Sequence, residues 1–313
     1  MSSDRHLEIR IAAFVSLFLL TALPLVSSPV ALVAGFLFSF FIGNPLPEQT
    51  SRAGKVLLKL SVIGLGFGIN FNEVIEVGSS SVMLTLISIT AIIGLGEILG
   101  RGMKIPLNTR RLVSFGTAIC GGSAIAAMAP VIRAKDREIA VSLATVFTLN
   151  AVALILFPPL GHLFGLNQQQ FGLWAALAIH DTSSVVGASA SYGAAALAIG
   201  TTVKLTRALW IAPCTLVANA VLKSGHRTGI PLFIIGFICA AFVNSWLPAF
   251  DDLWHFLHLI AKQALVMTLF LIGAGLTRKV LAEVGLKPLL MGIILWVVVS
   301  AISLGLIVGD LIP

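Results

Sequence analysis

The sequence predicts an all-α polytopic membrane protein, and three features of the chain lead to that fold class. Hydrophobic residues form 58% of the 313 residues and charged residues 11%, whereas a soluble domain carries about 25% charged residues. The hydrophobic residues gather into blocks of membrane-spanning length, and the mean hydropathy is +1.02. Lysine and arginine fall between these blocks, so the net charge of +7 indicates membrane topology rather than nucleic-acid binding.

Eleven apolar segments follow one another in a single integral membrane domain, residues 1–313. The first resembles a secretory signal peptide, but a second apolar segment starts at once at Pro29, which favours a retained span. The expected segments are 11–26, 29–43, 53–71, 81–99, 112–132, 139–160, 171–192, 194–222, 230–247, 254–276 and 286–309.

Positive charge alternates between successive connections, which places the N-terminus in the cytoplasm and the C-terminus outside. The expected external connections carry acidic residues instead, namely Glu73, Glu76, Asp251 and Asp252. The expected cytoplasmic charges are Arg52, Lys55, the cluster at 101–111, Lys223, Arg227, Arg278, Lys279 and Lys287.

One connection breaks this alternation. Arg133, Lys135 and Arg137 would face outside if segment 112–132 crosses the membrane fully. They return to the cytoplasm if that segment is a re-entrant hairpin, and 171–192 must then be a second hairpin from the outer face. Two topologies therefore remain open: eleven spans, or nine spans and two hairpins.

Two distant blocks, 29–99 and 231–309, look like copies of each other around a central core at 112–222. Gly66 and Gly68 match Gly273 and Gly275, and Glu76 matches Glu283, each 207 residues apart. Further matches, 201 residues apart, pair Gly35 with Gly236, Phe36 with Phe237, Phe41 with Phe242 and Leu46-Pro47 with Leu247-Pro248. The copies lie seven segments apart, and an odd offset reverses membrane orientation, which predicts an inverted repeat.

The stretch Gly116–Pro130 interrupts its segment with the adjacent glycines Gly121 and Gly122. Adjacent glycines disfavour a helix interior, and a broken helix is tolerated in a membrane only where protein or water surrounds the break. Secondary transporters place their substrates at such breaks. The alternative is that these small residues only allow close helix packing.

A second polar interruption, at 180–187, carries the ionisable residues that the first one lacks. Lys204 and Arg207 lie three residues apart on one face of the next segment, and either could pair with Asp181. Such a pair could be purely structural, or a leftover cation could attract an anion. Half-helices beginning at 121–123 and 182–184 would direct free N–H groups toward that anion. The predicted binding residues are Cys120, Gly121, Gly122, Ser123, Thr182, Ser183, Ser184, Lys204 and Arg207.

His180 and Asp181 are the predicted proton-coupling residues, because imidazole titrates near neutral pH and burial can bring a carboxylate into range. Asn150 is expected to join helices rather than bind a ligand. The three cysteines lack metal-ligand spacing, and the chain has no phosphate-binding loop and no interfacial cluster of catalytic residues. We therefore expect no cofactor, no metal site and no enzymatic activity.

The motifs at 116–130, 180–187 and 202–210 resemble the YeiH-type bacterial inner-membrane proteins, which are labelled sulfate exporters. The resemblance covers essentially the whole chain. More loosely, the chain resembles the bile acid:sodium symporter and cation–proton antiporter superfamily. That resemblance implies a panel and a core built from inverted repeats, with two discontinuous helices crossing at the membrane midplane.

These observations predict a secondary active transporter of a small inorganic or sulfur-containing anion, proton-coupled and working by alternating access. It would lie in the bacterial plasma membrane, with lipid and a small anionic solute as partners and without nucleic acid. A homo-oligomer stays open. The alternatives of another class are an ion channel, which would need a continuous polar face, and a membrane scaffold that transports nothing.

Overall fold

The computed structural model describes residues 2–222, 232–275, 285–309 and 311. Within these ranges the chain forms α-helices and short 3-10 helices and has no strand, which confirms the predicted all-α class. Several expected features lie outside the described residues: the charges Lys223, Arg227, Arg278 and Lys279, and the repeat residue Glu283.

Five described helices are long and apolar enough to cross a membrane, so the chain is a multi-pass membrane protein by length and composition. The number of spans, eleven or nine with two hairpins, stays a prediction. The five candidates are Phe71–Gly102, Arg137–Leu163, Ala194–Leu222, Pro248–Gly275 and Leu286–Val308.

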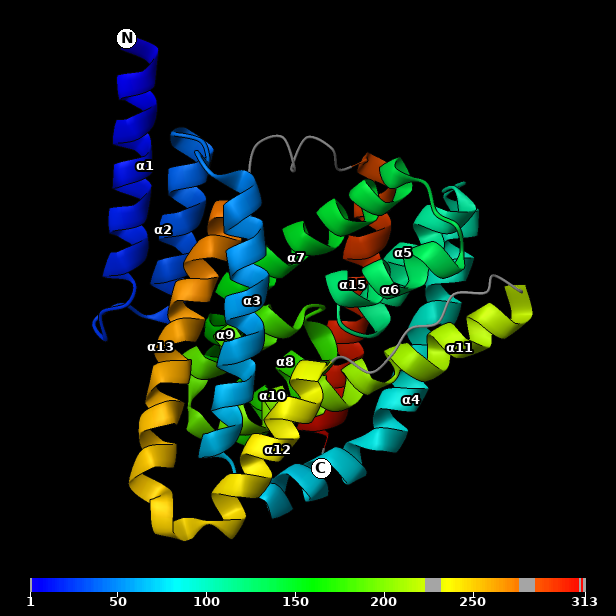
Figure 1. Cartoon of the computed structure of the whole chain (residues 1–313). Coiled ribbons are helices and arrows are strands. Elements are labelled where there is room, and N and C mark those ends of the chain that lie inside the picture. The colour runs from blue at the N-terminus through cyan, green and yellow to red at the C-terminus, as the bar shows by residue number, and fades with distance from the viewer. Residues whose placement is uncertain (1, 223–231, 276–284, 310, 312–313) are drawn as a thin grey trace. The chain divides into compact units, whose positions relative to one another are not determined.

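The chain folds into two compact units, and the first comprises Met1–Val74 and Leu232–Lys279. Within it, α2, α3 and α13 run side by side (Figure 1). Phe14 of α1 packs against the rings of Phe38 and Phe270, with centroids 5.4 Å and 5.3 Å away. The helices of this unit are α1 (Ser2–Leu20), α2 (Ser28–Phe41), α3 (Pro47–Leu65), η1 (Gly66–Gly68), α12 (Leu232–Trp246), η2 (Pro248–Phe250) and α13 (Asp251–Gly275).

Glycines let helices of the first unit approach closely at two places. Gly35 of α2 and Gly273 of α13 each lie against the other helix's main chain, where a β-carbon would overlap a carbonyl oxygen. Gly66 of η1 lies against the main chain of α12 in the same way, and Gly236 of α12 contacts Ile63 of α3. These four glycines are two matched pairs of the sequence repeat, and each lies where another helix of the unit approaches closely.

The second unit comprises Ile75–Pro231 and Val280–Pro313, and it contains both interrupted segments. Segment 112–132 is divided between α5 and α6, and segment 171–192 between α8 and α9. The helices of this unit are α4 (Phe71–Gly102, which begins in the first unit), α5 (Leu107–Ala118), α6 (Gly122–Val131), α7 (Asp136–Leu163), α8 (Gln168–Ala178), α9 (Thr182–Tyr192), α10 (Ala194–Leu209), α11 (Ile211–Leu222) and α15 (Leu286–Val308).

The helices α8 and α9 form a hairpin. Phe171 at the start of α8 stacks on Tyr192 at the end of α9, with ring centroids 3.8 Å apart and planes within 6°. In a continuous helix these residues would be about 30 Å apart. The chain therefore reverses at residues 179–181, and both outer ends of the pair lie together.

The helices α5 and α6 form the other hairpin. A β-carbon at Gly116 would lie 2.9 Å from the side chain of Ile125, although nine residues of continuous helix rise about 13 Å. At the outer ends, the Asn108 amide of α5 donates to Glu138, in the first turn of the helix that follows α6, at 3.0 Å. This corrects the expectation of crossing discontinuous helices, because each interrupted segment turns back instead.

The bases of the two hairpins lie at opposite ends of α7. Asn108 of the first hairpin reaches Glu138 in the first turn of α7. At the other end, Gly161 lies against the rings of Phe171 and Tyr192 in the second hairpin. The two bases are therefore separated by the length of α7, which is long and apolar enough to cross a membrane.

Candidate functional site

The tips of the two hairpins meet beside the middle of α7. A β-carbon at Gly121 would lie 3.2 Å from Cβ of Asp181 and 3.2 Å from the Val146 side chain. One turn further along α7, Asn150 Oδ1 accepts a hydrogen bond from the main-chain N–H of Asp181 at 3.1 Å. Gly121, Asp181, Val146 and Asn150 thus bring the two predicted breaks into one site.

The first tip turns at Gly121, whose φ is +64°. With ψ of −123°, this is a conformation that L-residues rarely adopt and that glycine adopts without steric cost. The N–H of Gly121 donates to the carbonyl of Gly116 at 2.8 Å, which closes the end of α5. The double glycine of the sequence is therefore a chain reversal, and α6 starts directly after it.

The two half-helices that begin at the tips are capped differently. At the N-terminus of α9, Asp181 accepts from the main-chain N–H of Ser183 at 3.0 Å and also from its hydroxyl. The N-terminus of α6, at Gly122, has no side-chain cap. Its first N–H groups carry the positive end of the helix dipole toward the meeting point of the tips.

The two half-helices that end at the tips are held by cations of α10. Lys204 Nζ donates to the carbonyl of Ile179 at 2.7 Å. Arg207 donates to the carbonyls of Ala176 and Leu177 at 3.1 Å and 2.7 Å, and also to the carbonyl of Ala118. One guanidinium therefore joins the C-terminal ends of α8 and α5, where a cation complements the dipole.

This arrangement differs from the ion pair considered for Asp181. The recorded hydrogen bonds of Lys204 and Arg207 all go to main-chain carbonyls, and the Asp181 carboxylate bonds to Ser183. Both cations are 0% exposed. Their direct contact with a ligand stays a prediction, whereas their contact with both hairpins is a feature of the fold.

The remaining predicted residues lie at or near the tips with different exposure. Ser123, in the first turn of α6, is exposed, and Asp181 is partly exposed. The other side chains of the set are buried, as are the glycines: Cys120, Gly121, Gly122, His180, Thr182, Ser183 and Ser184.

Sequence reasoning left Asn150 and Thr117 out of the site. Both are buried beside the tips, and Asn150 Nδ2 and Thr117 Oγ1 have no hydrogen-bond partner among the described residues. Neither nitrogen of His180 has one within the same ranges. Buried polar groups are normally paired, so unpaired ones gathered at one place indicate where a ligand could bind. The signal in the sequence was a lone polar residue in an apolar span, which helix packing explains equally well.

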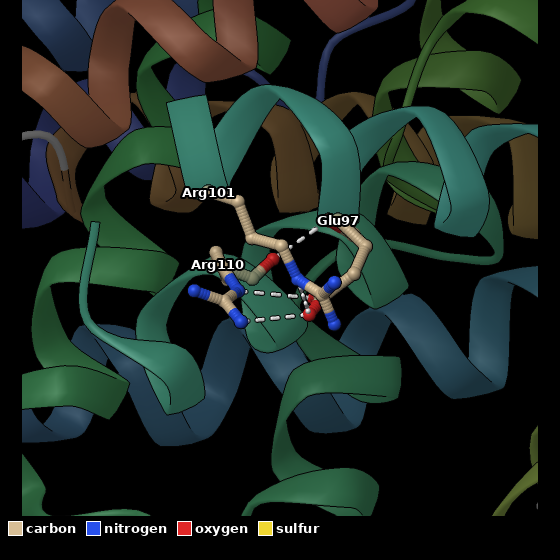
Figure 2. Close-up of polar contacts among 4 residues, drawn as sticks. Glu97, Arg101 and Arg110 are labelled. Carbon is tan, nitrogen blue, oxygen red and sulfur yellow. Dashed lines mark hydrogen bonds and ion pairs between the residues drawn. The ribbon is translucent and has the colours of Figure 1, made fainter. Parts of the chain in front are cut away.

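The base of the first hairpin is fixed by charge (Figure 2). Arg110 of α5 donates to both carboxylate oxygens of Glu97 on α4, at 2.7 Å and 3.1 Å. Arg101 also donates to Glu97 at 3.1 Å, although its side chain is 69% exposed. These bonds attach α5 to the end of α4, and the residues at the tip take no part in them.

Comparison with known proteins identifies the family. Residues 7–292 match a family model described as "Conserved hypothetical protein 698". A UPF0324 membrane protein of Geobacter sulfurreducens is 53% identical over 297 residues, covering 95% of this chain and 96% of the relative. One of Bdellovibrio bacteriovorus is 49% identical over 296 residues, covering 92% and 91% of the two chains. No solved structure matches. The chain belongs to the UPF0324 family of membrane proteins.

Proposed function

We propose that this protein is a secondary active transporter that moves a small inorganic or sulfur-containing anion by alternating access. The observation that carries the proposal is the uncapped N-terminus of α6, at the meeting point of two hairpins whose bases lie at opposite ends of α7. Interrupted helices that direct free N–H groups to the membrane interior are how transporters bind anionic groups.

The charges around the tips also favour an anion. Lys204 and Arg207 place two basic side chains in the protein interior, and the partly exposed Asp181 adds one carboxylate. The dipole ends oppose one another, because two half-helices begin and two end at the tips. A net positive charge remains in a low-dielectric surrounding, where a bound anion would be stabilised.

Proton coupling would involve His180 and Asp181. His180 has both ring nitrogens unpaired among the described residues, and Asp181 is partly exposed. Each group could exchange a proton as the anion enters or leaves. The Asp181 carboxylate also caps α9, so protonation would weaken that cap and link the proton to the second tip.

The hairpins support the proposed topology, in which the N-terminus is cytoplasmic, the C-terminus external and the location the bacterial inner membrane. Since α6 returns to the base of its own hairpin, Arg133, Lys135 and Arg137 join the basic cluster at 101–111 on one side. The alternation of positive charge is then unbroken. The repeated glycine contacts of the first unit support the proposed inverted repeat.

Uptake into proteoliposomes tests the function. Radiolabelled sulfate, sulfite and methanesulfonate would be compared for wild type, Lys204→Gln, Asp181→Asn and the exposed-lysine control Lys59→Gln. We expect saturable flux and counterflow, lost in Lys204→Gln and uncoupled from an imposed pH gradient in Asp181→Asn. The control should behave as wild type. Absence of flux for all three anions, or wild-type flux and coupling in both site variants, would contradict the proposal.

A further inference from the structure

We propose that Asn150 of α7 binds the transported anion by donating hydrogen bonds from its side-chain amide, with His180 as a neighbouring donor. The inference rests on the proposed function and assigns a ligand-binding role to a residue that sequence reasoning assigned to helix packing. It follows from where Asn150 lies, how its amide is oriented and which of its atoms are unpaired.

The position of Asn150 is fixed by α7. Val146 and Asn150 are four residues apart and share one face of this helix. Val146 contacts Gly121 at the first tip, and Asn150 bonds to Asp181 at the second. The Asn150 side chain therefore lies at the meeting point of the hairpins, one helical turn from the residue that contacts the N-cap of α6.

The orientation of the amide follows from its one recorded bond. Asn150 Oδ1 accepts from the main-chain N–H of Asp181 at 3.1 Å. Rotating the amide would place an N–H2 group against that N–H, so the oxygen must face Asp181. Nδ2 then points away from this bond, with two hydrogens to donate and no partner among the described residues.

The burial of this group makes the missing partner costly. Asn150 is 4% exposed, and an amide N–H2 removed from water without a partner destabilises the folded protein. A packing role is already fulfilled by Oδ1, which joins α7 to the second hairpin. The packing role does not explain why the side chain is an amide, because a residue with only an acceptor would make the same bond to the Asp181 N–H.

Other unpaired groups near the tips are also able to donate. Arg207 Nε and Thr117 Oγ1 lack partners within the described ranges, as do both nitrogens of His180. They come from α10, α5 and the second tip, so donors approach from several elements. A ligand that complements them must accept several hydrogen bonds, as the oxygens of an oxyanion do. The Asp181 carboxylate disfavours a ligand whose negatively charged oxygens outnumber the donors that the protein provides.

The variant Asn150→Asp separates binding from packing. Aspartate has the same shape and keeps an oxygen for the Asp181 N–H, but it replaces the two donors with an acceptor. Binding of sodium sulfate and sodium methanesulfonate to purified protein in detergent would be measured by calorimetry. We expect Asn150→Asp to bind at least tenfold more weakly than wild type. The matched control is Asn244→Asp in the first unit, where Nδ2 donates to the carbonyl of Ile69 at 3.3 Å, and it should keep wild-type affinity.

The uncharged variant Asn150→Ala covers the case in which Asn150→Asp does not fold. It removes the donors without adding charge and should also bind at least tenfold more weakly. Wild-type affinity in a folded Asn150 variant, or no binding of either anion to wild-type protein, would overturn the inference. If a folded Asn150 variant keeps wild-type affinity and the protein still shows saturable flux, the inference fails and the transporter proposal stands. Conversely, binding that depends on Asn150 without any flux would support the inference and contradict transport.

Discussion

The two hairpins of the second unit reverse direction by different chemical means. The first turns on a glycine with φ of +64° and leaves the start of α6 uncapped. The second turns through the extended residues Ile179 and Asp181, and the Asp181 carboxylate occupies the start of α9. One topology therefore provides one N-terminus without a side-chain cap and one that is capped by its own Asp181.

The bases of the hairpins differ as well. Charge holds the first, through Glu97 and its two arginines. The second is held by aromatic stacking of Phe171, Tyr192 and His162, and by the Tyr192 hydroxyl, which donates to the carbonyl of Leu166 at 2.6 Å. The first hairpin is thus attached by interactions that salt weakens, and the second by interactions that salt leaves unchanged.

Arg207 is the residue on which both hairpins depend, so its removal should have the largest effect. Arg207→Gln loses the guanidinium bonds to α5 and α8, and we expect the free energy of unfolding to fall by about 3 kcal/mol, with flux abolished. Arg207→Lys should be intermediate, because an ammonium lacks the planar fork that reaches both helices. Thermal unfolding in detergent measures this, with the exposed Arg137→Gln as control. An unchanged unfolding temperature in Arg207→Gln would show that the tips do not need the bridge.

Replacing Gly121 tests the first tip alone. At φ of +64° and ψ of −123° the backbone adopts a conformation that essentially only glycine populates, so alanine costs about 1–3 kcal/mol, and its methyl group would crowd Cβ of Asp181. We expect Gly121→Ala to lower both the unfolding temperature and the flux. Gly94→Ala is the matched control, since no atom lies within 4 Å of its added β-carbon and a helical alanine stabilises by about 1 kcal/mol. Equal behaviour of the two variants would exclude a special role for the turn.

The cap of the second tip can be separated from its charge. Asp181→Ala removes the cap of α9 and should cost about 1 kcal/mol of unfolding free energy. Asp181→Asn keeps a capping oxygen and should unfold close to wild type while losing proton coupling. The measurement pairs thermal unfolding with flux under a pH gradient. A stability loss as large in Asp181→Asn as in Asp181→Ala would mean that charge, and not capping, supports the tip.

The smallest effects are expected at the bases, where salt distinguishes the hairpins. Glu97→Gln should cost about 1 kcal/mol or less at low salt and nothing measurable at high salt, because its partners are partly exposed. Tyr192→Phe keeps the stacking, loses one hydrogen bond and should cost about 1 kcal/mol at either salt concentration. Unfolding curves at two sodium chloride concentrations provide the comparison. Parallel salt responses would contradict the assignment of charge to one base and aromatics to the other.

The positions of the helices and of both interruptions were predictable from the sequence, because apolar length and adjacent glycines act locally. The misplaced charges Arg133, Lys135 and Arg137 also favoured a hairpin, although they could not exclude a span. The partners of Lys204 and Arg207 were not predictable. No residue type in the sequence identifies a free carbonyl at a helix end, so the sequence alone favours the Asp181 carboxylate as the partner.

Asn150 shows the same limit from the other side. A single asparagine in an apolar helix is compatible with packing or with binding, and only the environment of each atom distinguishes them. That environment depends on Asp181, 31 residues away along the chain. Which atoms of the Asn150 side chain are paired therefore depends on the position of both tips against α7.

The place where the tips touch α7 has an electrical consequence. Val146 and Asn150 lie near the middle of this helix, whose ends mark the bases of the two hairpins. In the proposed transport cycle, an ion that reaches the tips from either side would have crossed about half of the membrane potential, or about 1 kcal/mol per charge for each 100 mV. Entry from one side and release to the other would each carry a similar share of the voltage dependence, so both steps would contribute to any current.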